Sequence, residues 1–248
     1  MPKRLALLFC LPGIALAAHP LSSDDAGTQG AGAWQLELNA DYLHEPETRT
    51  QQRFANLTLS TGLSDSFDLF VNGTALRSEA EAEGGNAAVA RGAGDASLGA
   101  KWRWFENDDI ALALKASANL PTGDAERGLG NGLPYYSGAA IVSVEVGEWT
   151  LMANAVGLYF TGDVDDQRKW QWALSTAAAY QLSDAWQLVG EVVAYSGDAP
   201  DSVGNAGLLT LGAIYRVLPT LDLDVGYRRG LMDSAVDHGL GAGLAFRW

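Results

Sequence analysis

The stretch GAGDASLGAKWRW, residues 92–104, alternates between apolar and polar side chains. Its apolar set ends in Trp102 and Trp104, and its polar set includes Lys101 and Arg103. A period of two indicates an extended strand with one apolar face and one polar face. A soluble sandwich would turn the apolar face inward against a second sheet, whereas a membrane barrel would turn it outward into lipid.

The same alternation recurs along nearly the whole chain after residue 33, for example in Trp34–Tyr42 and in Ile110–Leu120. These segments together predict about twelve strands of roughly nine to twelve residues, which is the length that crosses a bilayer at a tilt. Strands of soluble proteins are usually nearer about five or six residues. Strand length therefore favours the membrane barrel.

Short turns and longer polar loops are expected to alternate between these strands. The turns fall at Leu63–Ser66, Phe105–Asp109, Gly147–Glu148, Ser183–Asp184 and Val217–Thr220. The longer loops fall at Glu45–Gln52, Arg77–Ala93, Pro121–Tyr135, Thr161–Lys169, Ser196–Asn205 and Leu231–Asp237. Outer-membrane barrels place their short turns in the periplasm, their long loops outside, and girdles of aromatic residues at the strand ends. The sequence therefore predicts an all-β fold, an antiparallel transmembrane β-barrel with both termini on the periplasmic side.

The first residues have the features of an export signal. Lys3 and Arg4 precede the apolar run Leu5–Leu16, and Ala15–Ala17 forms an A-x-A cleavage pattern. We expect residues 1–17 to be a signal peptide, residues 18–33 a polar periplasmic segment, and residues 34–248 the barrel. This organisation predicts the outer membrane of a Gram-negative bacterium as the location.

Charge and cysteine content exclude several classes of function. The chain has a formal net charge of -14, so we expect no nucleic acid among its partners. Its one cysteine, Cys10, lies in the predicted signal peptide, which leaves the mature chain without a disulfide, a thiol nucleophile or a cysteine-based metal site. No cofactor is predicted.

Three motifs resemble those of a known family. They are HPLSSDDAGTQGAG (His19–Gly32), the strand GAGDASLGAKWRW (Gly92–Trp104) and the hairpin loop LPTGD (Leu120–Asp124). Their order and spacing, together with the terminal Trp248, are similar to the outer-membrane proteins of the MetA-pathway of phenol degradation family. The resemblance implies an outer-membrane channel or transporter for passive uptake or efflux of small compounds, including hydrophobic or aromatic ones. It supplies no catalytic motif and does not name the solute.

The polar face of the predicted strands supplies the candidate lining of the lumen. Charges of both signs occur there, at Glu37, Asp41, Asp68, Asp95, Lys101, Arg103, Lys115, Glu145, Glu191, Arg216, Asp222, Asp224 and Arg228. The turns are expected to bring Asp68 near Arg103 and Arg216 near Asp222. Such charges can form structural ion pairs that keep buried groups satisfied, or an electrostatic filter of the kind found in pores.

Residues 18–33 allow two interpretations. The segment is polar and rich in glycine, so it can fold into the lumen as a plug or remain disordered. A plug would favour the alternative function, a structural or interaction protein of the outer membrane with a blocked lumen. Conductance across a lipid bilayer would separate the two functions.

Enzyme and metal sites have weaker support in the sequence. A surface lipase would need a Ser–His pair on one face of the barrel. Closure could bring His44 and His238 together at the outer rim, and Ser234 is nearby in sequence, but no third residue is evident to orient the base. The loop carboxylates of Asp163–Asp166, Asp198 and Asp201 lack the EF-hand spacing. We therefore expect no catalytic residue and no metal site. The expected partners are outer-membrane lipid and lipopolysaccharide, and the barrel-assembly machinery through the C-terminal strand.

Overall fold

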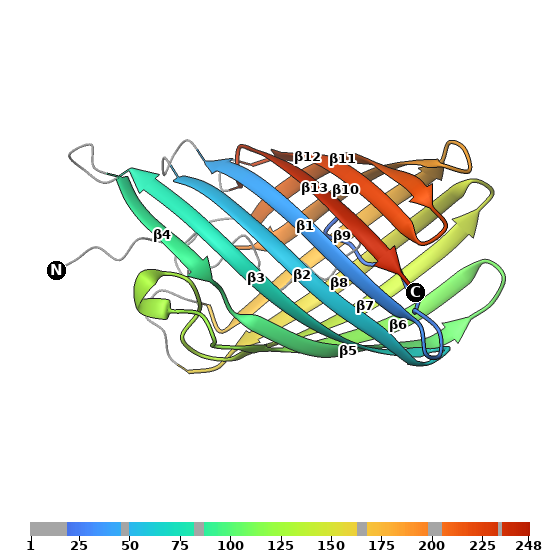
Figure 1. Ribbon diagram of the computed structural model, residues 1–248, viewed down its shortest axis with the longest axis horizontal. Helices are drawn as coiled ribbons and strands as arrows, with labels where there is room; N and C mark the ends of the chain where they lie inside the picture. The colour runs from blue at the N-terminus through green and yellow to red at the C-terminus, as the bar shows by residue number, and fades with distance from the viewer. Residues whose placement is uncertain (1–18, 46–49, 82–86, 163–167, 198–204, 233–234) are drawn as a thin grey trace.

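The computed structural model describes residues 19–45, 50–81, 87–162, 168–197, 205–232 and 235–248. Within these ranges the chain forms a barrel of antiparallel strands that are inclined to its long axis (Figure 1). The strands are β1 (Trp34–Glu45), β2 (Thr50–Ser64), β3 (Phe67–Glu81), β4 (Ala87–Ala93), β5 (Ala96–Glu106), β6 (Ile110–Leu120), β7 (Tyr135–Val146), β8 (Trp149–Phe160), β9 (Trp170–Gln181), β10 (Trp186–Ser196), β11 (Asn205–Leu218), β12 (Leu221–Gly230) and β13 (His238–Arg247).

The barrel is closed by the pairing of its first and last strands. β1 pairs with β13 on one side and with β2 on the other, and every later strand except β4 continues the ring back to β13. At the closure, Trp34 and Trp248 exchange two backbone hydrogen bonds of 3.0 and 3.1 Å. Twelve strands complete the ring and β4 is the one extra strand, which confirms the predicted barrel.

The alternating residues of each strand lie on opposite faces of the barrel wall, one outside and one inside. Large apolar side chains such as Leu57, Trp102 and Leu174 are 44%, 51% and 53% exposed on the outer wall. Their polar neighbours along the same strands, such as Thr58 and Lys101, are buried inside the barrel. The apolar face therefore points outward, as in a barrel surrounded by lipid.

The strand ends differ from the prediction around residues 77–95. The expected loop Arg77–Ala93 instead contains the last residues of β3 and the whole of β4. The expected single strand Gly92–Trp104 is interrupted at Gly94 and Asp95, so β4 pairs with the far half of β3 and β5 with its near half. Gly92 has a φ of 156° and Gly94 donates from its backbone N–H to the carbonyl oxygen of Thr74, which together redirect the chain there. Alternation alone does not reveal such a break, because both halves keep the same period.

The two ends of the barrel carry different connections. One end has tight turns between consecutive strands, such as Gly147–Glu148, and is called here the short-turn end. The opposite end, the long-loop end, includes the 3-10 helix η1 (Ala125–Arg127) between β6 and β7. Within the described residues, no helix is both long and apolar enough to span a membrane.

Candidate functional site

The segment His19–Ala33 runs around the inner wall of the barrel before β1 begins. Its successive residues bond to strands in falling order: His19 to β12, Ser22 and Ser23 to β10, Asp24 to β8, Ala26 to β7 and Gln29 to β3. The path ends at Ala31, which forms an isolated parallel bridge with Gly62 of β2. We call His19–Ala33 the lumen segment.

Small residues on the inner wall make room for the start of this segment. Gly212 of β11 and Gly226 of β12 lie opposite each other, and Pro20 covers both. A Cβ atom on either glycine would lie 2.5 Å from a carbon of Pro20, which is closer than two carbons can approach. Leu21, the next residue, is 6% exposed and packs against an apolar patch of β8–β11 that contains Met152, Ala177, Ala179, Val189 and Ile214.

Inward-facing polar side chains accept the backbone N–H groups of the segment. The Glu191 carboxylate accepts the N–H groups of Ser22 and Ser23, at 2.8 and 2.5 Å. The amide of Asn154 accepts the N–H of Asp24 and donates to its carbonyl oxygen, both at 2.8 Å. An irregular backbone cannot satisfy these groups itself, so the wall takes the place of a neighbouring strand.

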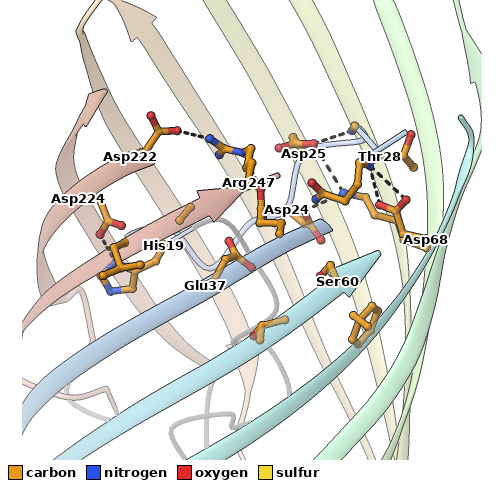
Figure 2. Close-up of a pocket in the computed structure, with 18 of the residues that line it drawn as sticks. His19, Asp24, Asp25, Thr28, Glu37, Ser60, Asp68, Asp222, Asp224 and Arg247 are labelled. Carbon is orange, nitrogen blue, oxygen red and sulfur yellow. Dashed lines mark hydrogen bonds and ion pairs between the residues drawn. The ribbon is translucent and has the colours of Figure 1, made fainter. Parts of the chain in front are cut away.

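Two lysines of the wall hold the carboxylate of Asp24. Lys101 Nζ of β5 lies 3.0 Å from Oδ1 and Lys115 Nζ of β6 lies 2.5 Å from Oδ2 (Figure 2). Burial alone would raise the pKa of Asp24, but the two ammonium groups outweigh it and hold the pKa below its ordinary value. Asp24 is therefore a carboxylate over the physiological pH range.

His19 is the other charged contact of the segment. Its Nδ1 bonds to the carboxylate of Asp224, and its Nε2 lies 3.3 Å from Oδ1 of Asp41. Burial lowers the pKa of His19, but hydrogen bonds and charge attraction from both carboxylates reverse this, so its pKa lies above the ordinary value. Arg228 completes the cluster by pairing with Asp41 and donating to the carbonyl oxygen of Pro20 at 3.0 Å.

Two cavities remain inside the barrel beside the lumen segment. The first, of about 340 Å³, is lined by charged groups such as Glu37, Asp68 and Arg247 (Figure 2). Phe70 and Ile214 line it as well. The second, of about 360 Å³, has carboxylates of the short-turn end at its edge, among them Glu106, Asp108, Asp109 and Glu145. Asp25 and Gly27 of the segment line both cavities, so the segment lies between them.

The residues predicted to line the lumen fall into four groups. Seven are buried inside the barrel, and these are Asp41, Asp68, Lys101, Glu191, Asp222, Asp224 and Arg228. Glu37, Arg103 and Lys115 are partly buried, and Glu37 and Lys115 line the first cavity. Glu145 and Arg216 are exposed near the short-turn end. Asp95 precedes β5 at the long-loop end, where its carboxylate accepts the N–H groups of Gly123 and Asn131, both at 2.8 Å, and so organises a loop.

One of the two expected ion pairs is present. Arg216 Nε lies 3.5 Å from Oδ1 of Asp222, its cross-strand neighbour. Arg103 is close enough to Asp68 for charge attraction, as expected. The two form no direct ion pair among the described contacts, because the β3–β5 register places Lys101 opposite Asp68. Arg103 instead donates to the carbonyl oxygen of Asp65 and pairs with Glu106. Asp68 accepts the N–H of Gln29 in the lumen segment.

The candidate enzyme and metal-binding residues do not belong to the lumen site. His44 and His238 meet at the β1–β13 closure, with ring centroids 5.1 Å apart, while Ser234 is outside the described residues. Asp163–Asp166, Asp198 and Asp201 also lie outside them. Within the ranges that the structure covers, no group of three or more histidine, cysteine, aspartate or glutamate side chains is arranged to hold a metal ion.

Uncharged polar residues of the wall were missed from the sequence. Asn154, Ser143 and Ser175 each bond to the lumen segment, at 2.7 to 2.8 Å. The alternation of their strands predicts that they face inward, but the predicted lumen lining contains charged residues alone. The signal in the sequence is that inward-facing uncharged polar residues occur on three neighbouring strands.

The chain was compared with known families and structures. The profile of the family described as "Putative MetA-pathway of phenol degradation" matches residues 23–248. An outer-membrane channel from Pseudomonas putida F1 superimposes with a TM-score of 0.77 at 15% identity, covering 90% of this chain and 98% of that one. The NanC porin superimposes with a TM-score of 0.63 at 9% identity, covering 85% of this chain and 98% of that one. The CymD monoaromatic hydrocarbon channel superimposes with a TM-score of 0.50 at 10% identity, covering 88% of each chain. No curated protein sequence matches the chain. At these identities the superpositions establish a common barrel fold.

Proposed function

We propose that this chain, which belongs to the MetA-pathway of phenol degradation family, is an outer-membrane channel for passive passage of small solutes. The observation that carries the proposal is a closed barrel whose interior keeps two cavities lined by charged side chains. A barrel with only a structural role can be filled by side chains, whereas a conduit needs polar, hydrated space along its axis.

The exterior supports membrane insertion. Most outward-facing residues along the strands are leucine, valine, alanine and aromatic side chains, and tryptophans such as Trp34, Trp149 and Trp186 stand at strand ends. An apolar band with an aromatic girdle matches the hydrocarbon core and interfaces of a bilayer. We place the short-turn end in the periplasm and the long-loop end outside.

The cavities limit the size and chemistry of the solute. Pockets for drug-sized ligands have volumes of about 300–1,000 Å³, and each lumen cavity lies near the lower limit of that range. The first cavity combines the apolar side chains Phe70 and Ile214 with charged groups. We therefore propose single-ring compounds that carry a polar group as solutes, in agreement with the family description.

The lumen segment supports a second candidate, a barrel whose lumen is plugged. Its residues bond to strands on most sides of the barrel, through Glu191, Asn154, Ser143, Lys101 and Lys115. A segment held this firmly would block flow unless it moves. We propose that it constricts the channel and that conduction occurs past it.

Planar-bilayer recordings on refolded protein separate the two candidates. The first variant lacks residues 19–31, and the second, Gly226→Leu, displaces Pro20 while keeping every charge. A constricted channel gives discrete current steps in the wild type and larger steps in both variants. A plugged barrel gives no steps in the wild type at any voltage. Gly138→Leu is the control, because a side chain there meets open space, and it should conduct as the wild type does.

Substrate choice needs a separate measurement. Wild-type protein in liposomes should admit phenol-like compounds faster than sugars of similar size, measured by uptake of radiolabelled solute. Equal rates for both classes would contradict the aromatic preference and leave a general small-solute channel.

A further inference from the structure

Three arginines stand side by side on the outer wall of the barrel. Arg53 of β2 lies directly opposite Arg77 of β3, and Arg77 lies directly opposite Arg91 of β4. Directly opposed residues point to the same face of a sheet, and all three side chains are exposed. They share this face with Leu57 and Leu69 of the apolar outer wall.

The arginine row lies at the level of an aromatic girdle. Tyr42 of β1 is the cross-strand neighbour of Arg53, whose Cζ lies 5.8 Å from the centre of the tyrosine ring. Trp34 marks the opposite girdle on the same strand, eight residues earlier. At about 3.3 Å per residue and a tilt of about 40°, this distance spans about 20 Å of bilayer thickness. The row therefore lies at the outer interface, where lipid phosphates are found.

A groove adjoins the row on the side toward the membrane centre. Four alanines, one on each of four neighbouring strands, are paired across the sheet at Ala242, Ala40, Ala55 and Ala75. Their short side chains leave a shallow groove of about 770 Å³ in the outer wall, and the three arginines line it as well. Figure 1 shows β13, β1, β2 and β3 side by side at this place.

The charges of the row are not balanced within the described residues. Like charges in direct opposition destabilise a sheet unless they are compensated. Arg77 pairs with Glu79, and Arg53 rests on the ring of Tyr42. Among the side chains that the structure describes, Arg91 has no ion pair. Among the described side chains, the row thus carries a positive charge on a chain whose net charge is -14.

We propose that this surface binds lipopolysaccharide, with a phosphate of lipid A on Arg53, Arg77 and Arg91 and an acyl chain in the alanine groove. A guanidinium group offers paired N–H donors that match phosphate oxygens, which makes arginine well suited to this anion. Free phosphate would use the arginines alone. A phosphorylated glycolipid in the outer leaflet uses both features. The proposal rests on the outer-membrane placement proposed above and not on what passes through the lumen.

The test measures thermal unfolding of the refolded barrel in vesicles, followed by the loss of heat-modifiable migration. Adding lipid A with two phosphates to phosphatidylcholine vesicles should raise the wild-type midpoint by about 4 °C or more. The variant R53Q/R77Q/R91Q should lose most of this rise, and R53K/R77K/R91K should keep part of it. Arg229→Gln, on the rim outside the groove, should retain the full rise.

Three further conditions identify the ligand. Phosphatidylglycerol vesicles, dephosphorylated lipid A and soluble inorganic phosphate should each raise the wild-type midpoint less than lipid A does. Equal rises with any of them, or an equal response of the wild type and the triple glutamine variant to lipid A, would overturn the proposal. If the wild type enters no vesicle, the membrane placement fails and this proposal with it. Insertion without a response to lipid A refutes this proposal alone.

Discussion

Lys101 Nζ lies 3.0 Å from Oδ1 of Asp24, which joins the barrel wall to the lumen segment across 77 positions of sequence. Lys115 holds the other carboxylate oxygen, and both lysine side chains are at most 12% exposed. The Asp24 carboxylate thus pairs with both buried ammonium groups at once. Asp24 is therefore a central contact in the docking of the segment.

Asp24→Asn is therefore expected to destabilise the barrel and to loosen the segment. Removing one partner of a buried ion pair costs about 3–5 kcal/mol. Because both lysines line the first, polar cavity, the loss should lie at the lower end of that range. Urea unfolding from lipid vesicles measures the stability, and single-channel recording should show larger current steps.

Asp25→Asn is the matched control for this prediction. The Asp25 side chain is 47% exposed and only one of its oxygens approaches Lys101, at 3.6 Å. Its replacement should change stability by about 1 kcal/mol or less, as for an exposed ion pair. An equal loss of stability in Asp24→Asn and Asp25→Asn would mean that the contacts of Lys101 and Lys115 with Asp24 do not stabilise the protein more than the Asp25 contact does.

The docking of the segment should also weaken as pH rises. The folded protein raises the pKa of His19 above 6.5, because the bonds to Asp224 and Asp41 outweigh its burial. A group with a raised pKa contributes its full stability below the unfolded value and loses it as pH passes the folded value. Wild-type stability should therefore fall as pH rises above the ordinary histidine pKa of about 6.5 and through the higher pKa of folded His19, measured by urea unfolding in vesicles.

His19→Gln separates this effect from other titrations. Glutamine keeps a hydrogen-bond donor toward Asp224 but has no charge to lose. The variant should be less stable than the wild type at the acidic end and show a flatter pH dependence. A pH profile parallel to that of the wild type would mean that groups other than His19 cause the dependence.

Most of the fold was accessible from the sequence because a membrane barrel obeys one local rule. Outward residues must be apolar and inward residues can be polar, so each strand shows its orientation through alternation. The break at Gly94 and Asp95 and the strand β4 were missed for the same reason. Both features keep the two-residue alternation of the strand and change only which part of β3 the strand pairs with. Strand pairing depends on residues far apart in the sequence.

The candidate site was less accessible. Inward charges such as Asp41 and Glu191 could be identified, but their partners come from a segment without periodicity. The bond between Ser23 and Glu191 joins positions 168 apart, and no local pattern specifies it. That Lys101 and not Arg103 lies opposite Asp68 has a similar origin, since a register shift of two residues exchanges Lys101 for Arg103 on the same face.

Labelling of intact cells should reveal the orientation of the barrel. A cysteine at Glu126, in the exposed helix η1, should react with a membrane-impermeant maleimide. A cysteine at Asp184, in the β9–β10 turn, should react only after the outer membrane is permeabilised. The native Cys10 lies in the predicted signal peptide, so a Cys10→Ser background excludes it as a source of signal. The reverse pattern would invert the topology.

Deleting Phe246–Trp248 should impair assembly far more than export. The Trp248 ring stacks on Trp34 at 6.3 Å between centroids, and both backbones are hydrogen bonded at the seam. Without these residues the first and last strands lose their final contacts, and the assembly machinery loses the end of the strand that we propose it recognises. The measurement is the heat-modifiable barrel in outer-membrane fractions compared with total exported protein. Trp248→Phe, which keeps an aromatic end, should assemble normally, and full assembly of the deletion would refute the prediction.

Trp102 and Arg103 provide the sharpest test of which face meets lipid. The Trp102 side chain is 51% exposed on the outer wall, while the side chain of Arg103 is 17% exposed and donates to the carbonyl oxygen of Asp65 at 2.8 Å. A lipid-facing arginine costs about 2–4 kcal/mol at the bilayer centre and less toward the interface. Because Trp102 lies near the short-turn end, Trp102→Arg should destabilise the barrel by about 1–2 kcal/mol.

The neighbouring substitution supplies the contrast. Arg103→Gln removes the ion pair with Glu106, whose side chain is 52% exposed, and should lower the stability by about 1 kcal/mol or less. The same variant should shift the ion selectivity in single-channel recordings. Trp102→Phe should be nearly neutral because it stays apolar. Urea unfolding from vesicles compares the three variants. If Trp102→Arg is silent and Arg103→Gln prevents folding, the apolar face of this strand does not meet lipid, and the membrane placement derived from it is wrong.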